Sequence, residues 1–382
     1  MILYIEKDVL DYPQTEKIIS LFPSASKVWI KNYKNIFDKS IPLHQEKSLI
    51  IAKSRGSAIG KTPDNYGHTP NTYFFKTSLN CVFDCAYCYL KGAFKNDMQV
   101  YFVNYEDIKR EITNLVISSG VERSFEETNN ETRKNNVISK EQISPLQSKG
   151  QIFNTINKNG KIHFKDPETS SGGQSPNIGC QEKNSTLWFY SSDYSDILGS
   201  NKISGFLSEF VPFFEKFEGV MMEVRSKSTN IKDILDLGFV PKNTEFAFSL
   251  NPQILIEKYE KGTPNLDDRI ETINKLINLG YKVGLRFLPL LPIKDYKNIY
   301  GEFVAYIKER IDLEKVHSSF ASGLLYTKED YNEILKKYPR LDILYRLKQE
   351  NDNFVRCDRD ARDFFYNLFH DLDENCMICM DD

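Results

Sequence analysis

The spacing of apolar residues changes along the chain, and the change predicts an order of strands and helices. After about residue 186, short apolar runs alternate with segments whose apolar residues recur at helical spacing. The runs predict strands at 187–190, 219–224, 244–250 and 282–290, and the periodic segments predict helices at about 202–217, 266–279 and 303–311. Asn265 is placed to cap the second helix and Gly280 to end it. Repeated strand–helix units indicate a parallel sheet covered by helices, either open or closed into a barrel.

The region before residue 186 has a different organisation. The first 75 residues mix short apolar runs with loops and predict a small α/β region. Strands are expected at 71–75 and 99–103, and Asn104 is placed to cap a helix over about 105–116. Residues 118–185 are rich in Asn, Ser, Glu, Lys and Gly, which predicts a surface insertion or mobile loop with one hairpin near 152–164. The expected divisions are therefore 1–75, a barrel at 76–335, and a C-terminal extension at 336–382.

Composition narrows the class of protein. The chain has 382 residues, of which 40% are hydrophobic and 27% charged, and this excludes a wholly disordered or fibrous protein. A net charge of −3 excludes a chain that is basic throughout, although it leaves room for a local basic groove. No apolar run reaches the roughly 18 residues of a membrane span, and no secretory signal is recognised. Three of the seven cysteines fall within eight residues, which favours metal or cluster ligation in a reducing cytoplasm over disulfides.

The chemistry is concentrated in the spacing Cys81-x3-Cys85-x2-Cys88. This spacing brings three thiolates onto one tight loop, where they can share an iron–sulfur cluster. A four-iron cluster takes four ligands, so three thiolates leave one iron open to bind another group. The alternative is a tetrahedral zinc site made by these cysteines and a distant Cys or His, and Cys376 and Cys379 could supply a second pair of ligands from the far end of the chain.

A cysteine loop of this kind, after one strand and ahead of a β/α series, resembles the radical S-adenosylmethionine (SAM) superfamily. Tyr87, the aromatic residue before the third cysteine, is part of the same pattern. The resemblance implies a partial (β/α)6 TIM-type barrel and a [4Fe–4S] cluster on Cys81, Cys85 and Cys88. It further implies that SAM binds the open iron, and that a one-electron reductant of flavodoxin or ferredoxin type triggers its cleavage. The resulting 5′-deoxyadenosyl radical would abstract hydrogen from a substrate.

Two longer segments, CAYCYL at 85–90 and VYFVNYEDI at 100–108, resemble the spore photoproduct lyase family. That family repairs a thymine photoproduct in DNA. The resemblance implies that Tyr87 and Tyr89 act as radical-relay tyrosines. It also implies that three residues contact SAM, and these are Ser192, Lys227 and Ser249. Each would stand at a strand end, where ligands bind in β/α barrels.

The sequence departs from the family's pattern at two places. Tyr190 stands where the family has its hydrogen-donating cysteine, so Tyr190 or another cysteine takes over that step, or the chemistry differs. The stretch 345–362, which matches the family's basic DNA-gripping hairpin, interleaves acidic residues with its arginines. Because phosphate binding depends on accumulated positive charge, this weakens the case for DNA. The open alternatives are a peptide, nucleoside or small-metabolite substrate, and a non-catalytic iron–sulfur or zinc protein.

The remaining cysteines and charged residues have less specific interpretations. Cys357, Cys376 and Cys379, together with Cys180, are free thiols, ligands of an auxiliary cluster or zinc, or a substitute hydrogen donor. The five histidines have no ligand spacing and receive no role. Arg286, on a predicted barrel strand, faces the active site or forms a salt bridge at the edge of the core.

Overall fold

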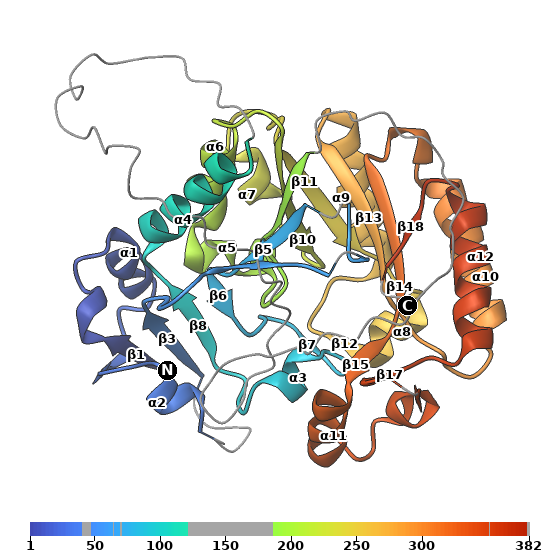
Figure 1. The fold of residues 1–382 in the computed structure, drawn as a ribbon, viewed down its shortest axis with the longest axis horizontal. Coiled ribbons are helices and arrows are strands. Elements are labelled where there is room, and N and C mark those ends of the chain that lie inside the picture. Colours follow the sequence, from blue (N-terminus) through green and yellow to red (C-terminus); the bar gives the residue numbers. More distant parts are fainter. Residues whose placement is uncertain (40–46, 64, 69–70, 121–185, 351, 380–382) are drawn as a thin grey trace.

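A curled, mostly parallel sheet dominates the computed structural model (Figure 1). The structure describes residues 1–39, 47–63, 65–68, 71–120, 186–350 and 352–379. Six consecutive neighbours in this sheet are parallel: β5 (Thr72–Phe75), β9 (Leu187–Tyr190), β10 (Val220–Ser226), β11 (Thr244–Ser249), β13 (Lys282–Leu290) and β14 (Ser318–Gly323). At one edge β4 (Ile59–Lys61) is antiparallel to β5, and at the other β18 (Met377–Ile378) is parallel to β14. This is the predicted partial (β/α)6 barrel.

Helices follow the strands and bury one apolar face each. They include α4 (Tyr105–Ser118), α5 (Ile197–Ser204), α6 (Phe206–Phe214), α7 (Ile231–Leu235), α8 (Gln253–Tyr259), α9 (Leu266–Asn278) and α10 (Tyr296–Arg310). In α4 the buried residues Ile108, Ile112 and Val116 are four apart, so they share one face. The phenylalanines of α6 pack on Phe75 of β5. The main hydrophobic core therefore lies between the outer face of the sheet and these helices.

A second, smaller sheet lies on the N-terminal side (Figure 1). Its order is β2 (Ser26–Ile30), β1 (Ile2–Glu6), β3 (Ser48–Ala52), β8 (Gln99–Phe102) and β6 (Ser78–Leu79), with α1 (Pro13–Leu21) and α2 (Lys34–Phe37) among its connections. The chain thus enters the large sheet at β4 and β5, returns to the small sheet at β6 and β8, and re-enters the large sheet at β9. The cysteine loop lies between β6 and β8, which are neighbouring strands of the small sheet.

The C-terminal part adds strand β18 and a small separate sheet of β15 (Leu325–Thr327), β16 (Lys348–Gln349) and β17 (Phe354–Arg356). Helices α11 (Lys328–Lys337) and α12 (Arg359–Leu372) accompany them, and α12 lies beside α10 in Figure 1. The predicted divisions near residues 75 and 335 remain predictions. At each of them, strands from both sides of the division belong to the same sheet. No helix in the described part of the chain is long and apolar enough to cross a membrane.

Most predicted elements are confirmed, and two details are wrong. The helix expected at 202–217 is two helices, because Gly205 adopts a left-handed conformation (φ 62°) that ends α5 before α6 begins. Asn104 precedes α4, but its side chain does not cap it. It accepts a hydrogen bond from the Ser54 amide (2.8 Å) and donates one to Asp107 (3.0 Å). The hairpin expected near 152–164 lies outside the described residues.

Candidate functional site

The three clustered cysteines lie on a loop that is anchored to the barrel by backbone pairing. Strand β7 (Asp84–Cys85) pairs antiparallel with β12 (Glu260–Lys261), and the Ala86 amide donates to the Tyr259 carbonyl (2.7 Å). Cys85 is buried, while Cys81 and Cys88 are partly exposed. All three are free thiols. The loop therefore holds its thiols at one place on the molecule and leaves two of them accessible.

Burial and neighbouring positive charges shift the pKa values of these thiols in opposite directions. Burial raises the pKa of Cys85 to about 12, and the Lys227 ammonium acts in the opposite direction. Burial also raises the pKa of Cys88, against the Leu90 amide, Lys227 and Lys91. Cys88 in turn raises the pKa of Cys81 and Cys85, so the three sulfurs sense one another's charge. A cation bound here would favour the thiolate forms that Lys227 already favours.

The spacing of the sulfurs distinguishes between kinds of metal site. A tetrahedral zinc site, with Zn–S bonds of about 2.3 Å, holds its sulfurs about 3.8 Å apart. Among the described residues, the groups of three ligand atoms within 4.8 Å of one another do not include these cysteines. The three sulfurs are therefore not all as close together as zinc ligands are.

Strand ends place the predicted cofactor-binding residues next to this loop. Lys227 directly follows β10, and its ammonium lies 5.8 Å from the centre of the Tyr87 ring. Ser192 lies two residues beyond β9 and is partly exposed, with its hydroxyl 3.4 Å from that of Ser191. Ser249 is the buried last residue of β11, and its carbonyl accepts a hydrogen bond from Arg269 (2.8 Å). All three belong to the carboxyl ends of adjacent strands, as expected.

Glu260, which the sequence analysis missed, links the cysteine loop to the strand ends. Its buried carboxylate accepts hydrogen bonds from Tyr87, from Asn251 (2.9 Å) and from Arg269 (2.6 Å). Lys227 lies 3.9 Å away, a longer and weaker ion pair. Although burial opposes ionisation, Lys227 and Arg269 hold the pKa of Glu260 at about 2. No local pattern marks Glu260, because its partners come from four separate segments.

Asp196 is a second connection that the sequence analysis missed. It caps α5 by accepting from the Gly199 amide (2.8 Å), and it also accepts from the Ser226 hydroxyl (2.7 Å) and the Lys227 amide (2.8 Å). This fixes the end of β10 against the start of α5, and it orients the backbone that carries Lys227. The N-cap itself was visible in the sequence as an Asp before an apolar segment.

The three predicted tyrosines have different surroundings. Tyr87 is buried and donates to Glu260, whereas Tyr89 is 39% exposed and donates to the Asp193 carbonyl. Tyr190 is buried inside the barrel, and its hydroxyl lies 3.1 Å from the His68 amide and 2.9 Å from His68 Nδ1. The hydroxyl of Tyr190 is thus already engaged by the loop that joins β4 to β5.

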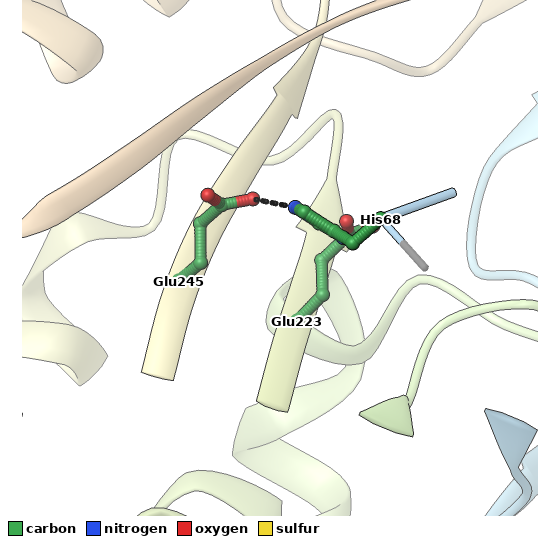
Figure 2. A group of neighbouring side chains, drawn as sticks. All are labelled: His68, Glu223 and Glu245. Carbon is green, nitrogen blue, oxygen red and sulfur yellow. Dashed lines mark ion pairs between the residues drawn. The ribbon is translucent and has the colours of Figure 1, made fainter. Parts of the chain in front are cut away.

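His68 belongs to an ionic network that fills the barrel interior. Figure 2 shows His68 directed at Glu245, with Glu223 beside it on the neighbouring strand. Their ligand atoms lie within 4.8 Å of one another, which is close enough for a metal ion. Arg286, however, already supplies the cation: its Nη2 lies 2.6 Å from Glu223 and also contacts Glu245. Arg286 therefore forms buried salt bridges, the second of the two alternatives, and we interpret this group as an ion-pair network.

Comparisons with known proteins agree with this geometry. Residues 178–360 match the family model described as spore photoproduct lyase. This match covers just under half of the chain, and over this stretch the chain is similar to the spore photoproduct lyase family. It is 27% identical over 155 residues to the spore photoproduct lyase of Clostridium acetobutylicum, covering 41% of this chain and 46% of that one. The Bacillus subtilis enzyme is 27% identical over 161 residues, again covering 41% and 46%. The alignments thus span about half the length of these curated relatives.

Solved spore photoproduct lyase structures resemble the whole chain. A variant with bound AdoMet and dinucleoside spore photoproduct superposes with a TM-score of 0.68 at 16% identity, covering 99% of this chain and 97% of that one. A complex with dinucleoside spore photoproduct has a TM-score of 0.66 at 17% identity, with the same coverage. These likenesses confirm the fold predicted for the family.

The C-terminal cysteines do not form a second site in the described residues. Cys357 and Cys376 belong to the main core, whereas Cys379 packs inside the barrel with Trp188 and Tyr190. No group of three close ligand atoms within the described chain includes them, and Cys180 lies outside the described residues. The auxiliary cluster or zinc remains a prediction without support from the structure.

Proposed function

We propose that this protein is a radical SAM enzyme that carries a [4Fe–4S] cluster on Cys81, Cys85 and Cys88. When bound, the reduced cluster and SAM supply a 5′-deoxyadenosyl radical for hydrogen abstraction. One observation carries the proposal: a three-thiol loop lies beside Lys227 at the carboxyl end of β10, and the ion pair of this lysine with Glu260 is long, 3.9 Å. Three thiolates leave one iron of a four-iron cluster open to a further ligand, which supports a cluster over zinc.

The residues at the strand ends receive roles that follow from their chemistry. Lys227 would pair with the carboxylate of SAM, because Glu260 is already satisfied by Arg269 and Asn251. Ser192 would offer its partly exposed hydroxyl, and Ser249 would contribute from the end of β11. Tyr87 and Tyr89 flank the third cysteine, and of these Tyr89 is the one accessible to a bound group. A flavodoxin or ferredoxin in the cytoplasm would supply the electron.

The first candidate substrate is a thymine photoproduct in DNA, the substrate after which the family is named. The reaction would be a lyase reaction, with hydrogen abstraction followed by cleavage and hydrogen return. Tyr190 would return the hydrogen in place of the family's cysteine.

A second candidate is the same radical chemistry on a different substrate, and the charges of the C-terminal hairpin favour it. Lys348 pairs with Asp358 (3.1 Å), Arg359 with Asp363 (2.8 Å), and Arg362 with Glu350 (2.7 Å). Arg356 contacts Glu350 and Asp352. Four cations of this hairpin thus have acidic partners within the chain, which leaves less positive charge for phosphates.

The test is an anaerobic assay. The protein is reconstituted with iron and sulfide, reduced with dithionite, and given SAM with or without the dinucleoside spore photoproduct. Release of 5′-deoxyadenosine supports the radical function, and its absence from a protein with about four irons per chain refutes it. Thymidine release identifies the lyase reaction. Release of 5′-deoxyadenosine with the dinucleoside intact points to the second candidate.

A further inference from the structure

Tyr66, a residue without an assigned role, lies between two of the tyrosines discussed above. Its hydroxyl donates to Asp193 Oδ1 (3.4 Å) and accepts from Arg225 Nη1 (2.8 Å). Tyr89 donates to the backbone carbonyl of the same Asp193. On its other side, the Tyr66 ring meets the Tyr190 ring edge to face, with centroids 5.6 Å apart. The order in space is therefore Tyr89, Asp193, Tyr66, Tyr190.

Tyr66 is close enough to Tyr89 and Tyr190 to interact electrostatically with both. It contributes to the electrostatic surroundings of Tyr89 and of Tyr190. The Arg225 guanidinium lies against both the Tyr66 and Tyr190 rings, at 5.7 and 5.4 Å from their centres. This shared cation keeps the two rings in contact, so their separation is set by a buried group rather than by a flexible surface loop.

Each inner phenol also has a group that can accept its proton. A phenol is oxidised readily when its proton moves to a hydrogen-bonded base as the electron leaves. For Tyr66 this base is the carboxylate of Asp193, whose pKa burial raises to about 6. For Tyr190 it is Nδ1 of His68, at 2.9 Å, and burial lowers the pKa of this imidazole to about 4. Near neutral pH both bases are therefore unprotonated.

We propose that Tyr66 is a redox-active tyrosine that passes an oxidising equivalent between Tyr89 and Tyr190. The proposal rests on the proposed function, because the oxidant is the carbon-centred radical which that function generates. When no substrate is bound, that radical takes a hydrogen atom from Tyr89, and the resulting Tyr89 phenoxyl takes an electron from Tyr66 and a proton from solvent. The Tyr66 proton moves to Asp193. Tyr190 then reduces Tyr66, its own proton moves to His68, and Asp193 returns the first proton to Tyr66.

The experiment replaces Tyr66 with 3-aminotyrosine, which keeps the hydroxyl and its hydrogen bonds but is oxidised more easily, so it traps a passing radical. The reconstituted, reduced protein is mixed with SAM and frozen for electron paramagnetic resonance. We expect an aminotyrosyl signal when the substitution is at position 66. We expect none at position 281, a tyrosine whose ring contacts Phe246 and whose hydroxyl donates to the Phe239 carbonyl (3.5 Å).

A second readout needs no cluster. In unloaded protein carrying 3-aminotyrosine at position 66, photo-oxidation by a ruthenium tris-bipyridyl complex should give the same signal. Asp193→Asn should lower its yield at least about tenfold, because the proton loses its acceptor. An equal yield in Asp193→Asn overturns the assigned proton transfer.

The two proposals fail differently. If wild-type protein releases 5′-deoxyadenosine but position 66 traps no radical, or position 281 traps as much, the role of Tyr66 is refuted and the radical function stands. If wild-type protein with a full cluster releases no 5′-deoxyadenosine, the proposed function fails, and the role of Tyr66 fails with it.

Discussion

The strand-end site and the barrel interior are both built from charged residues, yet they differ in how those charges are satisfied. Inside the barrel, Arg286 contacts both Glu223 and Glu245, and Arg225 contacts Glu223 at 2.7 Å. At the strand ends, Lys227 reaches Glu260 only at 3.9 Å, and Ser192 stays partly exposed. Buried charges without partners are strongly destabilising, so the interior is closed by its own pairs. At the strand ends, polar groups are paired less closely, as the proposed cofactor site requires.

The largest effect is expected from removing one of the three clustered thiols. Cys88→Ala should abolish both the cluster absorbance and 5′-deoxyadenosine formation, because two thiolates cannot hold a four-iron cluster that also keeps one iron open. The measurement is iron content and absorbance after reconstitution. Cys357→Ala is the matched control, since Cys357 lies in the core, away from the loop, and this variant should keep its iron. Loss of iron in both variants would contradict the assignment.

In the interior, Arg286→Met should destabilise the fold by about 3–5 kcal/mol, because it leaves the buried carboxylates of Glu223 and Glu245 without their shared cation. Urea unfolding at neutral pH measures the change. A loss below about 1 kcal/mol would show that the interior is not held by this pair. Arg310→Met, at an exposed ion pair with Glu309, is the control and should change stability little.

Acid should weaken the interior through His68. Its folded pKa of about 4 lies below its unfolded value near 6.5, so the folded state favours the neutral imidazole. The unfolded chain binds the proton first, and stability falls as pH decreases from about 6.5 to 4, by an amount of the order of 3 kcal/mol. Urea unfolding across this range should show the decrease in wild type and a smaller one in His68→Gln. Identical pH dependence would contradict a buried neutral His68.

The smallest effect on stability is expected at Lys227. Lys227→Met should cost less than about 1 kcal/mol of stability, because its ion pair with Glu260 is long and Arg269 still neutralises that carboxylate. It should nevertheless raise the KM for SAM about tenfold, or ~1.4 kcal/mol of binding. Lys232→Met, at an exposed pair with Asp236, is the control. An unchanged KM would remove Lys227 from the cofactor site.

Local patterns were sufficient for much of this description. Apolar runs located the strands of the barrel, and the spacing of Cys81, Cys85 and Cys88 indicated the chemistry, because both depend on neighbours in sequence. The split between α5 and α6 was missed although Gly205 was visible, since a glycine within a helical pattern does not by itself reveal a left-handed φ.

Local patterns did not reveal residues whose partners lie far away in the sequence. The sequence analysis assigned no role to His68, whose contacts with Tyr190 and Ser318 join positions 122 and 250 residues apart. Glu260 likewise accepts a hydrogen bond from Tyr87, which lies 173 residues away in the sequence. Tyr66 was one tyrosine among 21 until its position between Tyr89 and Tyr190 was known.

The sequence by itself determined the elements, the thiol loop and the residues that follow each strand, because strand and helix periods and cysteine spacing are properties of short segments. Only the tertiary structure decided which charges neutralise one another, which phenols touch, and that β18 closes one edge of the barrel. Those outcomes depend on contacts between segments brought together by burial. The same folding that satisfies Arg286 inside the barrel leaves Lys227 at its rim with only a distant anionic partner.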